Sequence, residues 1–270
     1  MSIKVVVQGA LGRAGRAAVE ILCREPGIDV VGVVDMLVSE KYLHLPDGSG
    51  KVPSSSNLDY ILTTCQPDVL VDFTEPSATM SAVHTATKRK VNLVIGTTGL
   101  TSDQISEIDH LARAAGVGAL MGTLSFGVVL VAHLASIAAK YFDYAEIVDL
   151  AKLEKLDAPS GASLDIAKAM TRARGKPFEL PQGQEKAPAS RGGQYEGVTI
   201  HSLRLSDAYI HQQVILGTRA GTMVTIGLEL TSSEYLRPGI VIAVKEAVKQ
   251  KGLVYGLDDV FLGVQMGNEV

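Results

Sequence analysis

Cysteine is scarce in this chain, and positive charge is not in excess. Only Cys23 and Cys65 occur, with no CxxC pair and no Cys/His group at zinc spacing, so we expect neither a disulfide framework nor a metal site. The 25 Lys and Arg against 29 Asp and Glu give a net charge of -4. A chain with this balance has no overall field that would steer it onto nucleic acid or an anionic membrane surface.

Signals for export and for membrane insertion are also missing. The N-terminus enters an apolar run at Ile3 with neither the charged start nor the cleavage site of a signal peptide, which predicts a cytoplasmic protein. Residues 114–139 carry no formal charge over a length that exceeds a membrane span. Glycines interrupt this stretch repeatedly, so we interpret it as a short strand, a turn and a buried helix and expect no membrane span.

The first half of the chain alternates short apolar strands with helical patterns. Ile3 to Gln8 is a largely β-branched run, followed by a glycine turn, a helical stretch 13–24 and a second apolar run 30–34. Further apolar runs at 69–73, 93–95 and 118–121 are separated by helical patterns at 77–89 and 102–115. This order predicts an α/β domain over residues 1–126, with a doubly wound parallel sheet of the Rossmann type covered on both faces.

After about residue 126 the pattern changes. A helix to Tyr141, a strand 145–153, a helix from Ser160 and a polar loop 176–197 precede three strand-like runs at 199–205, 211–217 and 223–230. Their spacing favours an antiparallel sheet. We therefore expect an α+β substrate-binding and oligomerisation domain over 127–237 with a mixed or antiparallel sheet, and we expect 238–270 to return to the first domain.

The turn after the first strand has the composition of a dinucleotide site. Gly9, Gly12 and Gly15 form a GxxGxxG sequence between strand and helix, where the backbone must turn tightly and let a pyrophosphate approach the helix N-terminus. Asp35 closes the second strand 20 residues after Gly15, at the place of an acid that accepts ribose hydroxyls. The competing interpretation is that Asp35 only caps a turn. Met36 follows where an Arg would help to bind a 2′-phosphate, so we predict NADH rather than NADPH as the preferred coenzyme, unless Lys41 or Arg13 contributes that charge.

Two further turns rich in threonine follow apolar strands, one at 73–76 and one at 96–99. In a doubly wound sheet ligands lie at the carboxyl ends of the strands, so these turns should border the nicotinamide half of the coenzyme. The predicted coenzyme-binding residues are Gly9, Leu11, Gly12, Arg13, Ala14, Gly15, Asp35, Phe73, Thr74, Gly96, Thr97, Thr98, Thr123, Ser125 and Phe126.

A second candidate site begins at Lys155. Ser160 is placed as the N-cap of a helix, so the free amides and the dipole of its first turn would face an incoming anion, with the Lys155 charge nearby. This chemistry suits a carboxylate, and the predicted substrate-binding residues are Lys155, Ser160, Gly161 and Ala162. Without the coenzyme half, a lysine before a capped helix would be read as purely structural.

Taken in order along the chain, these motifs resemble the dihydrodipicolinate reductases, enzymes of lysine and diaminopimelate biosynthesis that reduce a cyclic imine-derived acid with NADH or NADPH. The resemblance rests on the glycine start and on five later motifs, which are Asp-Phe-Thr-Glu-Pro at 72–76, Gly-Thr-Thr-Gly at 96–99, Lys-Leu-Asp-Ala-Pro-Ser-Gly at 155–161, Arg191-Gly192 and His-Ser-Leu-Arg at 201–204. It implies a Rossmann domain followed by a sheet domain through which such enzymes form homotetramers.

The chain also departs from the family pattern. Ala151 and Lys152 stand where the family has a His-His pair before the lysine, and no histidine lies between His133 and His201. The other departures remove donors or basic groups, and these are Ala162 for Thr, Thr123-Leu-Ser125 for Asn-Phe-Ser and, in a looser alignment, Leu228-Glu229 and Ser233 for a basic strand end and an Arg. Each unpaired polar group in a carboxylate site costs about 1–3 kcal/mol of binding, which predicts weak binding of the standard substrate.

Three functions are compatible with these residues. The leading hypothesis is an NAD(P)H-dependent reductase of a small carboxylated C=N or conjugated C=C substrate. In it Lys155 orients the substrate and donates the proton, and Lys152 replaces the absent histidines as a cation. Lys152 has an equal alternative interpretation as a solvated strand residue. The second hypothesis is an ordinary dihydrodipicolinate reductase, and the third is a non-catalytic NAD(P)-binding paralogue.

Overall fold

The computed structural model describes residues 2–180, 183–184, 186–187, 190–206 and 210–263. The chain divides into two compact units. Unit 1 contains residues 1–125 and 236–270, and unit 2 contains residues 126–235. The polar stretch 176–197 and the C-terminal segment both include positions outside the described residues, namely 181–182, 185, 188–189 and 264–270.

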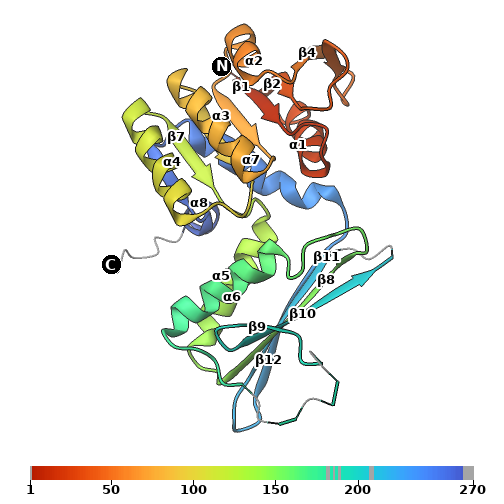
Figure 1. The fold of residues 1–270 in the computed structure, drawn as a ribbon, viewed down its shortest axis with the longest axis vertical. Helices are drawn as coiled ribbons and strands as arrows, with labels where there is room; N and C mark the ends of the chain where they lie inside the picture. Colours follow the sequence, from red (N-terminus) through yellow and green to blue (C-terminus); the bar gives the residue numbers. More distant parts are fainter. Residues whose placement is uncertain (1, 181–182, 185, 188–189, 207–209, 264–270) are drawn as a thin grey trace. The chain divides into compact units, whose positions relative to one another are not determined.

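Unit 1 is built on an eight-stranded sheet in the order β13-β7-β6-β5-β1-β2-β4-β3 (Figure 1). All neighbouring strands are parallel except β3 and β4, which form an antiparallel hairpin at one edge. The strands are β1 (Ile3–Gln8), β2 (Ile28–Val34), β3 (Tyr42–His44), β4 (Lys51–Ser55), β5 (Val69–Asp72), β6 (Asn92–Ile95), β7 (Gly118–Met121) and β13 (Gly252–Tyr255). The predicted parallel sheet is confirmed, whereas the β3–β4 hairpin and β13 were not foreseen.

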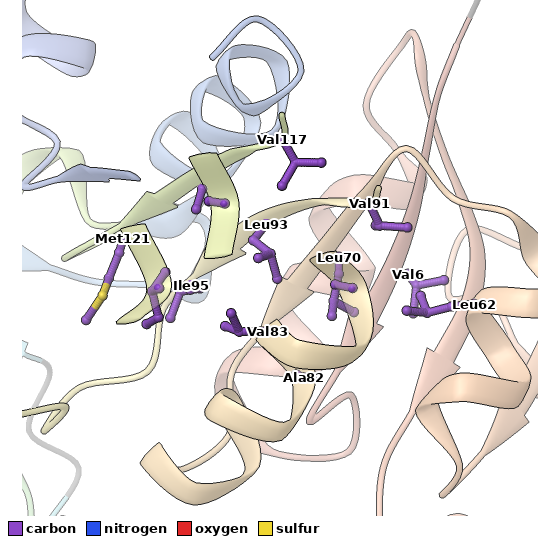
Figure 2. Close-up of a cluster of buried hydrophobic side chains, with 14 of the residues drawn as sticks. Val6, Leu62, Leu70, Ala82, Val83, Val91, Leu93, Ile95, Val117 and Met121 are labelled. Atoms are coloured by element: carbon purple, nitrogen blue, oxygen red, sulfur yellow. The ribbon is translucent and has the colours of Figure 1, made fainter. Parts of the chain in front are cut away.

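Helices cover both faces of this sheet, as the nearly continuous apolar strands require. They are α1 (Arg13–Cys23), α2 (Leu58–Cys65), α3 (Pro76–Lys88), α4 (Ser102–Ala115), α7 (Arg237–Ala247) and α8 (Asp258–Leu262). Figure 2 shows the core under α2, α3 and α4, in which Val6, Leu70 and Leu93 of the strands meet helix residues such as Leu62 and Val83. Helices α1 and α7 contact each other, and α1 packs against β1 and β2 while α7 packs against β5, β6 and β7.

The two segments of unit 1 meet where the chain leaves and re-enters it. A Cβ on Gly239, in the first turn of α7, would lie 1.9 Å from the carbonyl oxygen of Leu124. Only glycine allows this backbone approach. The chain therefore departs toward unit 2 and returns from it at neighbouring points of unit 1.

Unit 2 is a five-stranded sheet in the order β12-β11-β8-β10-β9, with two helices packed on one face. Its elements are α5 (Phe126–Ala139), β8 (Tyr144–Lys152), α6 (Gly161–Arg174), β9 (Gly193–Tyr195), β10 (Val198–Leu205), β11 (Ile210–Gly217) and β12 (Met223–Leu230), followed by a 3-10 turn (Ser233–Leu236). The antiparallel pairing expected for the last three strands is confirmed for β11 and β12, but β10 pairs with β8 in parallel. The sheet is therefore mixed.

The charge-free stretch 114–139 is divided between the end of α4, the strand β7 and the helix α5, as its glycines predicted. Among the described residues, no helix combines the length and the apolar character that crossing a membrane requires.

Candidate active site

In unit 1 the predicted coenzyme residues gather at the carboxyl edge of the sheet. Strand β1 has β2 on one side and β5 on the other, so the connections turn in opposite directions on either side of the β1/β5 pair. Ligands of doubly wound sheets bind at this kind of switch point. The glycine turn follows β1, the 73–76 turn follows β5 and the 96–99 turn follows β6, which brings all three to one place.

Two glycines of the first turn, Gly9 and Gly15, are required by close backbone approaches. A Cβ on Gly9 would lie 2.4 Å from the carbonyl oxygen of Phe73, and a Cβ on Gly15 would lie 2.0 Å from that of Gly9. Gly9 also has a φ of 75°, a left-handed conformation. Gly12 is the N-cap of α1, where no side chain caps the helix and no acidic residue stands in the first turn. The first-turn amides and the exposed Arg13 therefore form a positive, uncovered helix end that fits a pyrophosphate.

Asp35 is engaged by this turn. Its Oδ2 accepts a hydrogen bond from the Leu11 amide at 2.8 Å, and its Oδ1 accepts one from the Leu37 amide at 2.9 Å. Asp35 thus caps a turn, and its binding to a ribose stays a prediction. A carboxylate has about four acceptor positions, so two remain for ribose hydroxyls. The next side chain, Met36, is 83% exposed.

The two threonine turns are tied to one buried carboxylate. Thr74 Oγ1 donates to Asp72 Oδ1 at 2.7 Å, and Thr97 Oγ1 donates to Asp72 Oδ2 at 3.0 Å. The Thr74 amide donates to Thr97 Oγ1 at 3.1 Å. The hydroxyls of Thr74 and Thr97 therefore point into the protein, while Thr98 is exposed. Sequence reasoning had assigned no role to Asp72, although an acid at a strand end followed by threonines was a usable signal.

Aromatic packing adds a second link between these turns. A Cβ on Gly96 would lie 2.4 Å from Phe73 Cε1, so the ring of Phe73 lies against Gly96. After β7 come Thr123 and the buried Ser125, both in unit 1, whereas Phe126 is the first residue of α5 in unit 2. The structure thus brings together all the predicted coenzyme residues of unit 1 along the carboxyl ends of its strands.

In unit 2 the Lys155 amine is held by a neighbouring acid. Lys155 Nζ lies 2.7 Å from Asp157 Oδ1 and 2.9 Å from Asp157 Oδ2. Burial alone would raise the pKa of the Asp157 carboxyl, but the hydrogen bond and charge of Lys155 bring it below its ordinary value. The side chains of Lys155 and Asp157 are 20% and 57% exposed. The ion pair therefore reaches the surface of the unit, where another anion could take the place of Asp157.

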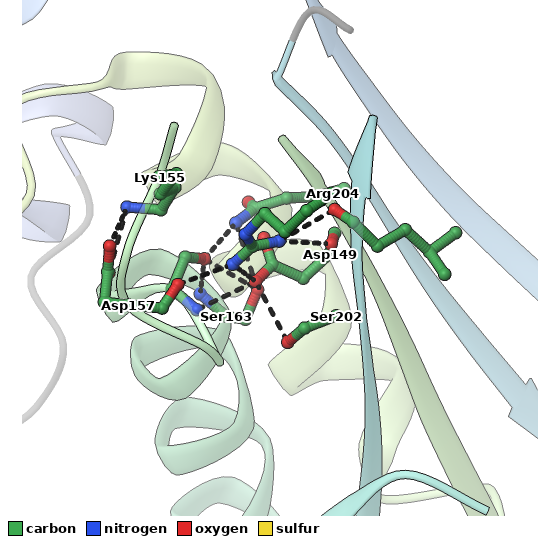
Figure 3. A network of polar contacts seen from close by, with 9 residues as sticks. Asp149, Lys155, Asp157, Ser163, Ser202 and Arg204 are labelled. Carbon is green, nitrogen blue, oxygen red and sulfur yellow. Dashed lines mark hydrogen bonds and ion pairs between the residues drawn. The ribbon is translucent and has the colours of Figure 1, made fainter. Parts of the chain in front are cut away.

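A buried ion pair holds the loop that carries Lys155 (Figure 3). Arg204 Nη2 lies 3.1 Å from Asp149 Oδ2, and the two side chains are 13% and 1% exposed. Arg204 Nη2 also donates to the Asp157 carbonyl at 2.7 Å, and Asp149 Oδ2 accepts from the Ser160 amide at 2.8 Å. One charge pair thus connects β8, β10, the Lys155 loop and the start of α6.

The N-terminus of α6 is formed as predicted, with Ser160 as its N-cap. Ser160 Oγ accepts from the Ser163 amide at 3.2 Å, and Gln212 Nε2 lies 3.4 Å from the same oxygen. Ser160 is 5% exposed, so its hydroxyl serves the helix from inside. The first-turn amides of Gly161 and Ala162 have no carbonyl partner within the helix, and they are the groups that an anion would meet.

Lys152 lies on the other face of β8. The alternation along the strand directs Asp149 and Ala151 toward the helices and Lys152, with Glu146, toward the exposed face. Its role as a replacement cation for the family's histidines therefore stays a prediction, and the structure does not place it beside the α6 N-terminus.

Comparison with known proteins gives full-length matches. Residues 3–123 match the family model described as "Dihydrodipicolinate reductase, N-terminus" and residues 127–261 the model described as "Dihydrodipicolinate reductase, C-terminus". A 4-hydroxy-tetrahydrodipicolinate reductase of Dehalococcoides mccartyi is 42% identical over 257 residues, covering 95% of this chain and 97% of the relative. One from Moorella thermoacetica is 36% identical, with 96% and 97% covered.

Solved structures agree with these matches. The structure described as dipicolinate-bound dihydrodipicolinate reductase from Paenisporosarcina sp. TG-14 superposes with a TM-score of 0.80 at 30% identity, covering 96% of this chain and 99% of that one. An amine dehydrogenase from Mycobacterium smegmatis, at 12% identity and a TM-score of 0.66, covers 94% of this chain and 95% of its own and shares the fold alone.

Proposed function

The chain belongs to the dihydrodipicolinate reductase family, whose members are NAD(P)H-dependent reductases, and on that premise we propose that it reduces 4-hydroxy-tetrahydrodipicolinate in lysine and diaminopimelate biosynthesis. The observation that carries this proposal is the layout of 155–161. A lysine amine and the first-turn amides of Gly161 and Ala162 at the α6 N-terminus stand on one segment, and both are groups that bind a carboxylate. The relatives at 36–42% identity bear the name of this activity over nearly their full length, which favours it over the different acid expected from the missing histidines.

The residues of unit 1 fit a nicotinamide dinucleotide. In the glycine turn, a side chain at Gly9 or Gly15 would clash with the neighbouring backbone. The N-terminus of α1, which follows this turn, would receive the pyrophosphate. When bound, the coenzyme supplies the hydride for the reduction. The two free acceptor positions of Asp35 would take ribose hydroxyls, and Met36 offers no charge for a 2′-phosphate. We therefore propose NADH as the preferred coenzyme, to be compared directly with NADPH in the same assay.

The residues of unit 2 hold the acid and a proton. A substrate carboxylate replaces Asp157 as the partner of Lys155 Nζ. The same carboxylate accepts hydrogen bonds from the Gly161 and Ala162 amides. Lys155 Nζ is then the proton donor of the reaction. Arg204 and Asp149 hold this loop in place through the Asp157 carbonyl and the Ser160 amide.

The test is a steady-state assay of NADH oxidation with the condensation product of pyruvate and aspartate semialdehyde. We expect turnover in the native protein and a loss of roughly 10²- to 10⁴-fold in kcat for Lys155→Met. Lys152→Met is the matched variant on the neighbouring strand end. A loss equal to that of Lys155→Met assigns Lys152 to the site, and unchanged kinetics leave it a solvated residue.

Two other outcomes would replace the proposal. Oxidation of NADH only with other carboxylated imines or unsaturated acids would make the chain a reductase of a different acid. Tight NADH binding in calorimetry, without turnover of any acid, would make it a coenzyme-binding paralogue. We also propose that the protein is cytoplasmic and forms a homotetramer through the sheet of unit 2. Sedimentation of the purified protein tests the homotetramer.

A further inference from the structure

Asp72 is a completely buried acid without a basic partner in the described part of the chain. It ends β5 with 0% exposure, and its hydrogen bonds come from three threonine hydroxyls. Burial raises the pKa of the Asp72 carboxyl, and the hydroxyls act against that rise. An acid in this environment is unfavourable compared with an apolar residue of similar size, so its presence calls for a role other than packing.

The three hydroxyls belong to three separate segments. Thr74 lies in the turn after β5, Thr97 lies in the turn after β6, and Thr79 lies in the first turns of α3. Thr79 Oγ1 donates to Asp72 Oδ2 at 2.5 Å, the same oxygen that Thr97 approaches. An ionised carboxylate only accepts, and it has about four positions, so it can collect three donors at once.

We propose that Asp72 is a positioning residue of the coenzyme site, which fixes the turns 73–76 and 96–99 against each other and against α3. The inference rests on the proposed function, because it assigns these turns to the nicotinamide half of the coenzyme. Since Thr74 and Thr97 turn their hydroxyls toward Asp72, the backbone of the two turns and the exposed Thr98 are what the coenzyme meets.

Two buried threonines on the same helix allow a matched test. Thr79 donates to Asp72, whereas Thr87, also buried on α3, donates to the Val83 carbonyl one turn earlier. Thr79→Val and Thr87→Val remove the same hydroxyl from the same helix, and only the first takes a donor from Asp72. Thr97→Val removes a donor from one of the turns, and Thr79→Ser and Thr97→Ser restore each hydroxyl.

NADH affinity is measured by calorimetry on the purified full chain, followed by KM for NADH and KM for the acid in steady state. We expect Thr79→Val and Thr97→Val to raise the Kd and KM for NADH by up to about tenfold, because the free energy of the lost hydrogen bond to Asp72 limits an effect that reaches the coenzyme only through the turns. The KM for the acid should stay within about twofold, and the serine variants should recover the native values. Thr87→Val should bind NADH like the native protein, whatever its effect on the unfolding temperature.

The outcomes separate the inference from the function on which it rests. If Thr79→Val lowers the unfolding temperature but binds NADH as Thr87→Val does, Asp72 only supports the fold and the inference is overturned. The same holds if Thr97→Val alone weakens binding, because Thr97 would then act without Asp72. If the native protein binds neither NADH nor NADPH, the proposed function itself is wrong.

Discussion

Each of the two units holds its loops in place with a buried acid, but the groups that bind the acid differ. In unit 1 the two threonine turns are bound to Asp72, a buried acid that accepts hydrogen bonds from neutral hydroxyls. Unit 2 ties the Lys155 loop to Asp149, a buried acid paired with Arg204. In the first case oriented hydroxyl groups hold the buried carboxyl, and in the second an opposite charge pairs with it. The difference predicts that the two anchors respond differently to mutation and to pH.

The choice of anchor matches what each loop must hold. In the proposed site, the turns of unit 1 meet the coenzyme through their backbone. The short side chains of Thr74 and Thr97 hold that backbone close to Asp72. The loop of unit 2 carries the flexible Lys155 side chain and the Asp157 carbonyl, which Arg204 reaches from a strand that lies far away in sequence. A long, planar guanidinium with five donors can bind both the acid and the loop carbonyl, which no hydroxyl can do.

The largest effect should come from removing the cation of unit 2. Arg204→Met leaves Asp149 buried and unpaired, which should lower the free energy of unfolding of unit 2 by about 3–5 kcal/mol. Calorimetry and circular dichroism report this, since the chain has no tryptophan. The double variant with Asp149→Leu should recover most of the loss, because the charge is gone. A single variant as stable as the native protein would contradict the view of the pair as an anchor.

A smaller effect should follow from removing helix caps, one in each unit. Ser160 caps α6, and Thr101 caps α4 through a capping box with Gln104. Ser160→Ala and Thr101→Ala should each cost about 1 kcal/mol in the free energy of unfolding. Only Ser160→Ala should also raise the KM for the acid, because the proposed function places the substrate at α6 and not at α4. An equal KM effect in both variants would show that the α6 end has no special part in binding.

The smallest effect is the opposite pH dependence of two acids. The folded state raises the pKa of Asp72, so the stability it contributes is full below its unfolded pKa and falls as pH rises toward the folded value. Asp157 has a lowered pKa, so its contribution is present above the unfolded value and is lost as pH falls through the folded one. The Asp157 effect should be slight, because its side chain is 57% exposed and screened by solvent.

Thermal midpoints of Asp72→Asn and Asp157→Asn, measured against the native protein over about pH 3 to 7, check this contrast. Relative to the native protein, Asp72→Asn should gain as pH rises. Asp157→Asn should lose ground over the same interval. Differences of the same sign in both variants would show that the two acids are not held in opposite ways.

Much of the fold could be predicted because its signals are local. The strands β1, β2, β5, β6 and β7 are apolar runs bounded by turn residues, and all lie within a few residues of the expected positions. The β3–β4 hairpin was missed because its strands are short and polar and include Pro53, as edge strands often do. The parallel pairing of β10 was missed because spacing along the chain does not say which strand becomes the neighbour.

For the site, as for the fold, local patterns could be predicted and contacts between distant positions could not. Glycine spacing and the Ser160 cap are local patterns, and the structure has both at the expected places. The roles of Asp72 and Arg204 depend on contacts between distant positions, such as Asp149 and Arg204, 55 residues apart. Whether Lys152 belongs to the site depends on strand alternation counted from the paired register, which the sequence alone did not supply.

The contact between Gly239 and the Leu124 carbonyl has a consequence for how such a chain can be rearranged. Since the chain leaves unit 1 and returns to it at neighbouring points, unit 2 is an insertion at one place in unit 1. Exchange of that insertion by recombination would leave the order of the parallel strands unchanged. An architecture of this kind lets unit 2 be replaced while the framework of unit 1 stays the same.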